Sequence, residues 1–140
     1  MNYNFQIKQF EGIGENADKI AISGSDGDIS WKTLKQKVEQ LSSVFNELKI
    51  PAGHPVIIYG HKELLFPIAL LACIHSGITY VPIDIVYPIE RIKKIVELTD
   101  SQILINCSEN SFDIDFPVVI NKIFELTKNA FTDFTNETYT

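Results

Sequence analysis

The sequence predicts an α/β fold, in which a parallel βαβαβ sheet carries helices on both faces and follows a small N-terminal β-hairpin. Short apolar runs at 56–59, 80–83 and 103–105 are typical of buried strands. Helix-length segments separate these runs, and this alternation favours parallel strands joined by right-handed crossovers. An Asp-Gly pair at residues 26–27, between two further short apolar runs, indicates the hairpin.

The composition is that of one soluble globular domain. The chain has 140 residues, of which 45% are hydrophobic and 21% charged, so a sizeable core is feasible. Twelve basic and 18 acidic residues give a net charge of −6 without a basic stripe, which argues against binding to nucleic acid or to an anionic membrane. No secretory signal is visible, and Cys73 and Cys107 lie in unrelated contexts. We therefore expect a reducing, cytoplasmic location.

The first elements expected are the hairpin and one amphipathic helix. Strands at 20–23 and 28–30 flank a turn at 24–27. Ser30 is placed to cap a helix that starts directly after it, because apolar residues then recur every three or four positions. The Pro-Ala-Gly sequence at 51–53 is expected to end this helix.

The later part of the chain continues the alternation. An amphipathic helix is expected at 88–99, a further strand at 117–120 and a short helix at 122–128. We expect a subdomain over 1–128 and a loop or extended tail over 129–140.

A helix expected at 64–75 raises the question of what covers it. Residues 68–74 are apolar on every side, and such a helix is normally covered on every side. The sheet would cover one side only. The remaining cover is another part of this chain, a second subunit that docks on an exposed apolar surface, or further polypeptide.

No catalytic, cofactor-binding or metal-binding residue is assigned from the sequence. The motifs G-x-S-x-G, GxxxxGK[ST] and HExxH are absent, and no cluster has metal-ligand spacing. Residues 12–17 fit the G-x-G-x-x-A form of a dinucleotide fingerprint. That motif needs a strand before it and a helix after it, whereas here the order is reversed, so we expect a loop that ends a helix.

The three histidines have no spacing that indicates a metal site or a catalytic base. His61 and Lys62 follow the strand at 56–59, at the edge of the sheet where ligands of open α/β folds bind. Because the sequence places no acid beside them, we expect a solvated loop. His75 is expected to interact with the last carbonyls of its helix, and His54 is assigned no role.

The acidic residues are expected to be structural. Asp84 with Asp113 or Asp115 could form a carboxylate pair, but nothing in the sequence fixes their separation, so we expect loop capping. Glu90 lies one helical turn before Lys94, and we expect a weak surface ion pair between them.

The segment SGITYVPID, residues 76–84, resembles the second core motif of amino-acid adenylation domains, which commonly reads L-K-A-G-x-A-Y-V-P-I-D. Gly77 and residues 80–84 match in register, whereas Thr79 and residues 74–76 depart from it. We expect Gly77 to stop the preceding helix. The strand is expected in the middle of the sheet, with Pro82 near its end, where a missing donor is tolerated, and Asp84 capping the turn that follows.

Two neighbouring segments extend the resemblance. Pro88, Glu90, Arg91 and Ile92 match the P-x-E-R-[IL] that usually follows, and residues 29–34 resemble the first motif, L-T-Y-x-E-L, with Thr33 in place of its glutamate. Over roughly residues 15 to 110 the chain is therefore similar to adenylate-forming enzymes, the superfamily of acyl-CoA synthetases, peptide synthetase adenylation domains and luciferases. The wording YVPID is most like amino-acid adenylation domains and D-alanine:D-alanyl carrier protein ligases.

The resemblance implies a parent enzyme that uses ATP and Mg²⁺ to activate an amino acid as its adenylate and then loads a carrier-protein thiol. The family's phosphate-gripping loop, Y-T-S-G-[ST]-T-G-x-P-K-G, its ribose-binding acid and its lysine match no position here. The resemblance thus implies that the chain is a fragment of a larger adenylation domain, with no catalytic activity and no cofactor of its own. Its implied partners are the remainder of that domain and a carrier protein.

Two other functions remain open from the residues alone. One is a stand-alone interaction module whose apolar helix docks a partner or a second copy. The other is a flavodoxin-like nucleotide binder that uses the loops after the strands at 56–59 and 80–83.

Overall fold

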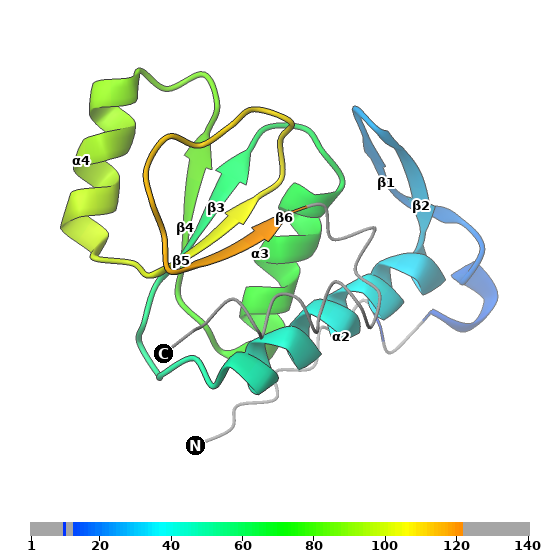
Figure 1. Cartoon of the computed structure of the whole chain (residues 1–140). Coiled ribbons are helices and arrows are strands. Elements are labelled where there is room, and N and C mark those ends of the chain that lie inside the picture. Colours follow the sequence, from blue (N-terminus) through cyan, green and yellow to red (C-terminus); the bar gives the residue numbers. More distant parts are fainter. Residues whose placement is uncertain (1–9, 11–12, 122–140) are drawn as a thin grey trace.

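A computed structural model of the chain describes residue 10 and residues 13–121. Four parallel strands form one sheet in the order β4-β3-β5-β6, and two antiparallel strands form a separate ribbon (Figure 1). The α/β fold with its N-terminal hairpin is confirmed. The elements are η1 (Gly14–Asn16), β1 (Ile20–Gly24), β2 (Gly27–Ser30), α2 (Trp31–Leu48), β3 (Val56–Gly60), α3 (Leu65–Ser76), β4 (Tyr80–Asp84), α4 (Ile89–Thr99), β5 (Ile103–Asn106) and β6 (Val118–Asn121).

The hairpin and the start of α2 form as their sequence signals indicate. Gly24 pairs with Gly27, which leaves a two-residue turn, and the Ser30 hydroxyl accepts a hydrogen bond from the Thr33 N–H at 3.2 Å. The end of α2 differs slightly from the prediction. Lys49 adopts the left-handed conformation with a φ of 53°, so the helix stops before Pro51, because a residue that precedes proline disfavours the helical conformation.

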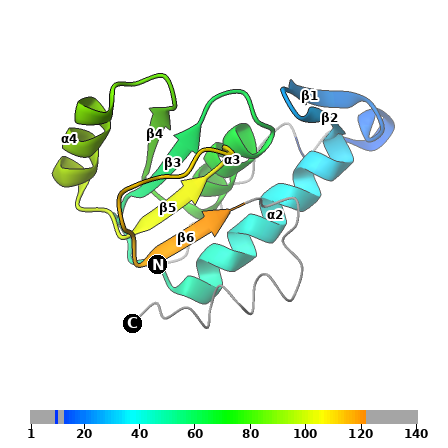
Figure 2. The same ribbon diagram turned by 45° about the horizontal axis from the view of Figure 1, so that its top comes forward.

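Helices cover both faces of the sheet. Helices α2 and α3 lie on one face and α4 on the other (Figures 1 and 2). The strand order explains this arrangement. The connection through α3 leads from β3 to one neighbour and the connection through α4 leads back past β3 to the other, so crossovers of the same right hand lie on opposite faces.

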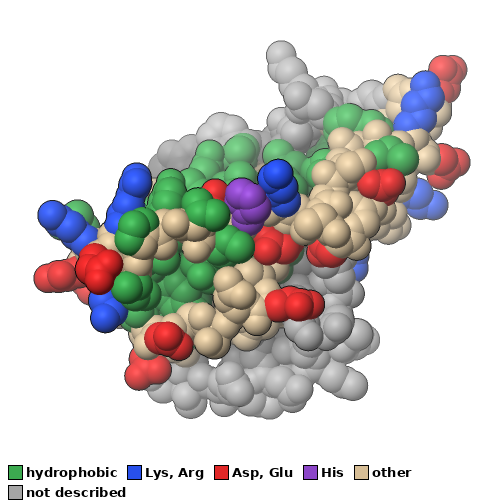
Figure 3. All heavy atoms as spheres, turned by 90° about the horizontal axis from the view of Figure 1, so that it is seen from above, with side chains coloured by type: hydrophobic (Ala, Val, Ile, Leu, Met, Phe, Trp, Pro, Cys, Tyr) green, Lys and Arg blue, Asp and Glu red, His purple; other side chains and the backbone are tan. Residues whose placement is uncertain are grey.

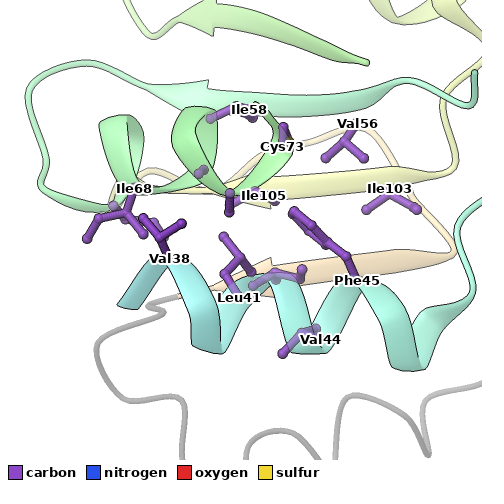
Figure 4. Packing of buried hydrophobic residues seen from close by; sticks show 14 of the residues in the cluster. Val38, Leu41, Val44, Phe45, Val56, Ile58, Ile68, Cys73, Ile103 and Ile105 are labelled. Atoms are coloured by element: carbon purple, nitrogen blue, oxygen red, sulfur yellow. The ribbon is translucent and has the colours of Figure 1, made fainter. Parts of the chain in front are cut away.

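The cover of α3 comes from within the chain. Its residues Ile68, Ala69, Ala72 and Cys73 are fully buried. Figure 4 shows Ile68 and Cys73 among side chains of α2 and of the sheet. Helix α2 therefore supplies a second side of the cover. Ile74 is 42% exposed, and Phe66, Leu70 and Leu71 of α3 are half-buried.

The connection from β5 to β6 has no helix. Along residues 111–116, half-buried apolar side chains alternate with exposed polar ones, which is the period of an extended chain that packs on one side. Phe112 packs edge to face against Tyr59, with ring centroids 4.7 Å apart. The ring centroids of Phe116 and Phe112 are 5.8 Å apart. This segment, residues 107–117, therefore takes the place of a crossover helix on the α4 face.

The predicted position of β4 is wrong. The strand lies at an edge of the four-stranded sheet, not in its middle, because the crossover through α4 leads from β4 back past β3, and β5 is added on the other side of β3. Pro82 is the third of the five residues of β4, not a terminal one. The stop at Gly77 is confirmed, since this residue has a φ of 68° and its N–H bonds to the carbonyls of Cys73 and Ile74.

Two expectations lie outside the described residues, namely the short helix at 122–128 and the tail at 129–140. Within the described ranges, no helix is both long and apolar enough to cross a membrane.

Candidate functional site

The carboxyl edge of the sheet is the candidate site, since ligands of open α/β folds bind there. Strands β3, β4, β5 and β6 end at this edge with Gly60, Asp84, Asn106 and Asn121. Figure 3 views the molecule from above, toward this edge, and shows a histidine beside a basic side chain, acidic side chains and a group of hydrophobic ones.

His61 and Asp84 meet at this edge. The Nδ1 of His61 lies 3.1 Å from each carboxylate oxygen of Asp84. This corrects the expectation that no acid lies beside His61. Because β3 and β4 pair in parallel with Gly60 opposite Asp84, the residues that follow one strand meet the end of the other.

Asp84 also caps the turn after β4, as expected. Its Oδ1 accepts the Val86 N–H at 3.1 Å. This backbone hydrogen bond, followed by the hydrogen bond and charge of His61, lowers the pKa of the Asp84 carboxyl below its ordinary value, although partial burial acts in the other direction. Both side chains are about one-third exposed, so the pair remains accessible from solvent.

The tip of the hairpin is fastened to the same edge. The Ser25 N–H donates to the Lys62 carbonyl at 2.9 Å, and Asp26 Oδ1 accepts the Leu64 N–H at 2.9 Å. Asp26 thus caps the first turn of α3 from 38 residues away, where an acidic group is favoured by the helix dipole. Gly24 is needed for this approach, because a Cβ there would lie 2.8 Å from the Lys62 carbonyl oxygen.

The crevice between β3 and β5 is the topological switch point, because the connections from β3 and from β5 lead to opposite faces. Side chains fill it. A Cβ on Gly60 would lie 2.8 Å from Cys107 Cβ and 2.9 Å from both Glu63 Oε1 and Phe66. Burial, with the nearby carboxylates of Glu63 and Asp26, raises the pKa of the Cys107 thiol, so it is not an activated nucleophile.

Two open hollows flank the filled crevice. One, of about 700 Å³, lies over β5 and β6 and is lined by Leu104, Asn106, Ser108, Glu109, Asn110, Ser111, Phe112, Ile114, Val119 and Asn121. The Asn106 side chain is already committed, because its Nδ2 donates to the Asn110 carbonyl at 2.9 Å and its Oδ1 accepts from Ser108 at 3.0 Å. A smaller hollow of about 440 Å³ separates the hairpin from Lys62 and Pro67.

The flavodoxin-like alternative needs the loops after β3 and β4 to bind a nucleotide. These loops lie side by side, but His61 and Asp84 bridge them directly. The switch point of this topology lies between β3 and β5 instead. Sequence reasoning therefore placed that hypothetical site beside the wrong pair of strands, since strand order is not encoded locally.

The remaining candidates lie apart and have structural roles. The His54 Nε2 accepts the Gln102 N–H at 3.1 Å. His75 does lie in the last turn of α3, but its buried Nδ1 has no hydrogen-bond partner within the described structure. Residues 14–16 form a 3-10 turn before β1, so a dinucleotide fingerprint is not formed there.

The surface pairs differ in part from the prediction. No ion pair joins Glu90 to Lys94 in the described part of the chain; instead, Arg91 lies 4.1 Å from the centre of the Tyr87 ring. Asp113 accepts from the Ser111 hydroxyl at 3.5 Å, and Asp115 is exposed beyond it.

The described residues do not fit a magnesium–nucleotide site. No group of three His, Cys, Asp or Glu side chains among them could hold a metal ion, and the crevice at the switch point is closed by Cys107 and Phe66. Groups that grip phosphates, namely a run of free backbone amides or a cluster of cations, are not assembled at this edge in the part of the chain that the structure describes.

Comparison with solved structures confirms the fold. The chain superposes on a nonribosomal peptide synthetase in its α-methyl-L-serine-AMP bound form with a TM-score of 0.72 and 20% identity, over 95% of this chain and 14% of that one. It superposes on the N-terminal subdomain of NpsA from Klebsiella oxytoca with a TM-score of 0.63 and 19% identity, over 95% of this chain and 32% of that one.

Curated relatives are D-alanine–D-alanyl carrier protein ligases. The protein from Listeria welshimeri is 40% identical over 82 residues, which are 58% of this chain and 16% of the relative. The protein from Bacillus licheniformis is 28% identical over 69% of this chain and 19% of its own length. The protein from Staphylococcus epidermidis is 23% identical over 89% of this chain and 28% of its own length. The chain therefore spans less than a third of these relatives.

The family match covers nearly the whole chain. Residues 10–133 match the family described as AMP-binding enzyme, which confirms the resemblance carried by the YVPID segment and its neighbours. On this match, the chain belongs to the AMP-binding enzyme family.

Proposed function

We propose that this chain is the N-terminal scaffold of an ATP-dependent ligase that activates an amino acid as its adenylate and transfers it to a carrier-protein thiol. The observation that carries the proposal is the family match over residues 10–133. The three relatives described above support it, because each is a D-alanine–D-alanyl carrier protein ligase. The YVPID wording agrees with amino-acid activation.

The chain itself is proposed to have no ligase activity. At its carboxyl edge, the Asp84 carboxylate is already hydrogen-bonded to His61 and to the Val86 N–H. The described ranges contain no metal-binding cluster. In such a ligase the amino acid carboxylate would attack the α-phosphate of ATP and pyrophosphate would leave, while Mg²⁺ would neutralise phosphate charge. We therefore assign the binding of ATP and of Mg²⁺ to residues in the remainder of the adenylation domain. That remainder is the first proposed partner of this chain, and the carrier protein is the second. A cytoplasmic location suits such a reaction.

A segment exchange tests the function. The homologous segment of the Listeria welshimeri ligase would be replaced by residues 10–133 of this chain, and D-alanine-dependent exchange of pyrophosphate into ATP would be measured. We expect exchange activity in the chimera. A matched chimera with Gly60→Val should lose it through misfolding, because a side chain collides with Cys107. A folded chimera that activates neither D-alanine nor other amino acids would contradict the proposal.

The isolated chain provides the complementary measurement. Titration of the 140-residue protein with ATP and Mg²⁺ is expected to give neither heat nor a shift in melting temperature, and no pyrophosphate release. Release of pyrophosphate by the chain alone, above that of a Gly60→Val variant prepared in the same way, would show that the catalytic groups are present after all.

A further inference from the structure

The YVPID segment contains a proline at an unusual place. Strand β4 is an edge strand with no strand on its outer side among the residues that the structure describes. An edge strand presents unpaired backbone groups that can pair with another chain. Pro82 occupies the centre of this strand and is exposed. The direction of its backbone groups therefore decides which hydrogen-bond donors the outer edge presents.

The hydrogen bonds to β3 fix that orientation. The Val56 N–H donates to the Thr79 carbonyl at 2.9 Å, and the Ile85 N–H donates to the Gly60 carbonyl at 3.1 Å. With Val56 opposite Tyr80 and Gly60 opposite Asp84, the odd-numbered residues of β4 direct their backbone groups toward β3. The backbone groups of the even-numbered residues, which include Pro82, are therefore directed outward.

The outward row is interrupted at its middle. Proline carries no N–H, so Pro82 offers only its carbonyl. The Asp84 carbonyl is already taken, since it accepts the Tyr87 N–H at 3.0 Å. The donors left on this edge are the amides of Tyr80 and Asp84, one at each end of the strand, with none between them.

The side chains of this segment would otherwise favour pairing. Residues 78–87 read ITYVPIDIVY, which is rich in β-branched and aromatic residues and carries one charge, on Asp84. Segments of this composition without proline are prone to strand addition between chains. Tyr80 is 37% and Val86 69% exposed, so apolar surface accompanies the open edge.

We propose that Pro82 prevents the outer edge of β4 from pairing with β4 of a second copy of this chain. The strand is self-complementary in a two-fold antiparallel pairing, with residue 82 opposite itself and Tyr80 opposite Asp84. The two residues of the central pair would exchange two N–H···O bonds if residue 82 were not proline. With proline, neither bond forms and two carbonyls face each other. This role is independent of the proposed ligase function.

The test is self-association of Pro82→Val and Pro82→Ala, measured by sedimentation velocity and light scattering across a wide concentration range. Both variants restore the outward N–H, and Pro82→Ala does so without adding a β-branched side chain. Because Pro82 donates nothing to β3, both should keep the circular dichroism and cooperative melting of the wild-type chain. We expect self-association on the order of tenfold tighter than in the wild type, since two hydrogen bonds are gained.

Two further variants make the outcome specific to the backbone donor. Thr79→Val replaces the hydroxyl of an exposed side chain by a methyl group just before β4, at a residue whose backbone groups are directed toward β3 and not outward. It should behave as the wild type. Adding Tyr80→Asp to Pro82→Val places a carboxylate opposite Asp84 of the second copy, and this like-charge pair should restore the wild-type mass. Amide hydrogen exchange should show protection of the new residue 82 N–H in the associated species.

Three results would overturn the proposal. The first is a folded Pro82→Val protein whose mass equals that of the wild type at every concentration. The second is association of Thr79→Val as strong as that of Pro82→Val, which would assign the effect to apolar side chains. The third is a wild-type dimer in which the Tyr80 and Asp84 amides are protected, which would show pairing through β4 despite the proline.

Discussion

The Nδ1 of His61 lies 3.1 Å from both carboxylate oxygens of Asp84, across 23 residues of sequence. The pair joins the ends of β3 and β4, and the same Asp84 carboxylate holds the turn that leads to α4 through the Val86 N–H. One side chain thereby fixes two connections at the carboxyl edge of the sheet.

Asp84→Asn should weaken the acid dependence of stability. A carboxyl whose pKa is lowered in the folded state stabilises the fold above its unfolded pKa, about 3.9, and this stabilisation is lost as the pH falls through the folded pKa. The substituted amide keeps an acceptor for the Val86 N–H but cannot titrate. Urea midpoints measured from neutral pH to below about pH 4 should therefore fall less in the variant. Asp113→Asn, at an exposed residue of the 107–117 segment, is the control and should follow the wild type. Parallel loss of stability in Asp84→Asn and the wild type would contradict the assignment.

Gly60→Ala should destabilise the chain by about 1–3 kcal/mol, the usual cost of forcing a methyl group into a packed site. The added Cβ would lie 2.8 Å from Cys107 Cβ, so the crevice between β3 and β5 must open. Gly14→Ala is the matched control, because a Cβ there has nothing within 4 Å. Chemical denaturation of the two variants gives the comparison, and equal stability would show that the crevice is not closed as described.

Asp26→Ala should cost about 0.5–2 kcal/mol, the range for removing a helix cap. The substitution leaves the Leu64 N–H at the start of α3 without its acceptor. Asp28→Ala removes an exposed carboxylate from the same hairpin and should have little effect. If the two variants unfold at the same denaturant concentration, the contact between the hairpin and α3 contributes nothing to stability.

The two thiols should react slowly in the folded chain. Burial raises the pKa of the Cys73 thiol to about 12 and also raises the pKa of the Cys107 thiol, so at pH values near about 8 little thiolate is present. Alkylation followed by mass spectrometry should proceed at the rate of unfolding at the buried Cys73, and more slowly than at a fully exposed thiol at the partly exposed Cys107. Urea should accelerate it at both residues. Cys107→Ser isolates Cys73. Rapid modification of Cys73 in the native chain would show that α3 is not covered by α2.

Local sequence predicted the elements of this fold well, because each has a local cause. The Asp-Gly turn at residues 26–27, the Ser30 cap and the stop at Gly77 all depend on neighbours within a few residues. The apolar runs of β3, β4 and β5 likewise identify strands buried by helices on their faces. The helix expected at 122–128 lies beyond the described residues and stays a prediction.

The features that sequence reasoning missed depend on strand order. Whether β4 lies inside the sheet or at its edge is decided by the direction of the crossover through α4, which no residue of β4 encodes. The meeting of His61 with Asp84 follows from the same order. One signal was available: Pro82 at the centre of an apolar strand is compatible with an edge strand only. The aromatic segment at 111–116 was also readable, since its apolar residues alternate with polar ones.

The two faces of the sheet are unequally shielded from water. On one side, α2 and α3 bury a continuous core, whereas on the other α4 contributes Ile92 as its one buried residue and an irregular segment takes the place of a second helix. Regions with few buried contacts open at a lower free energy than the global transition. Amide protons of α4 will therefore exchange with solvent through small local fluctuations, whereas those of β3 and β5 will exchange only when the whole molecule unfolds.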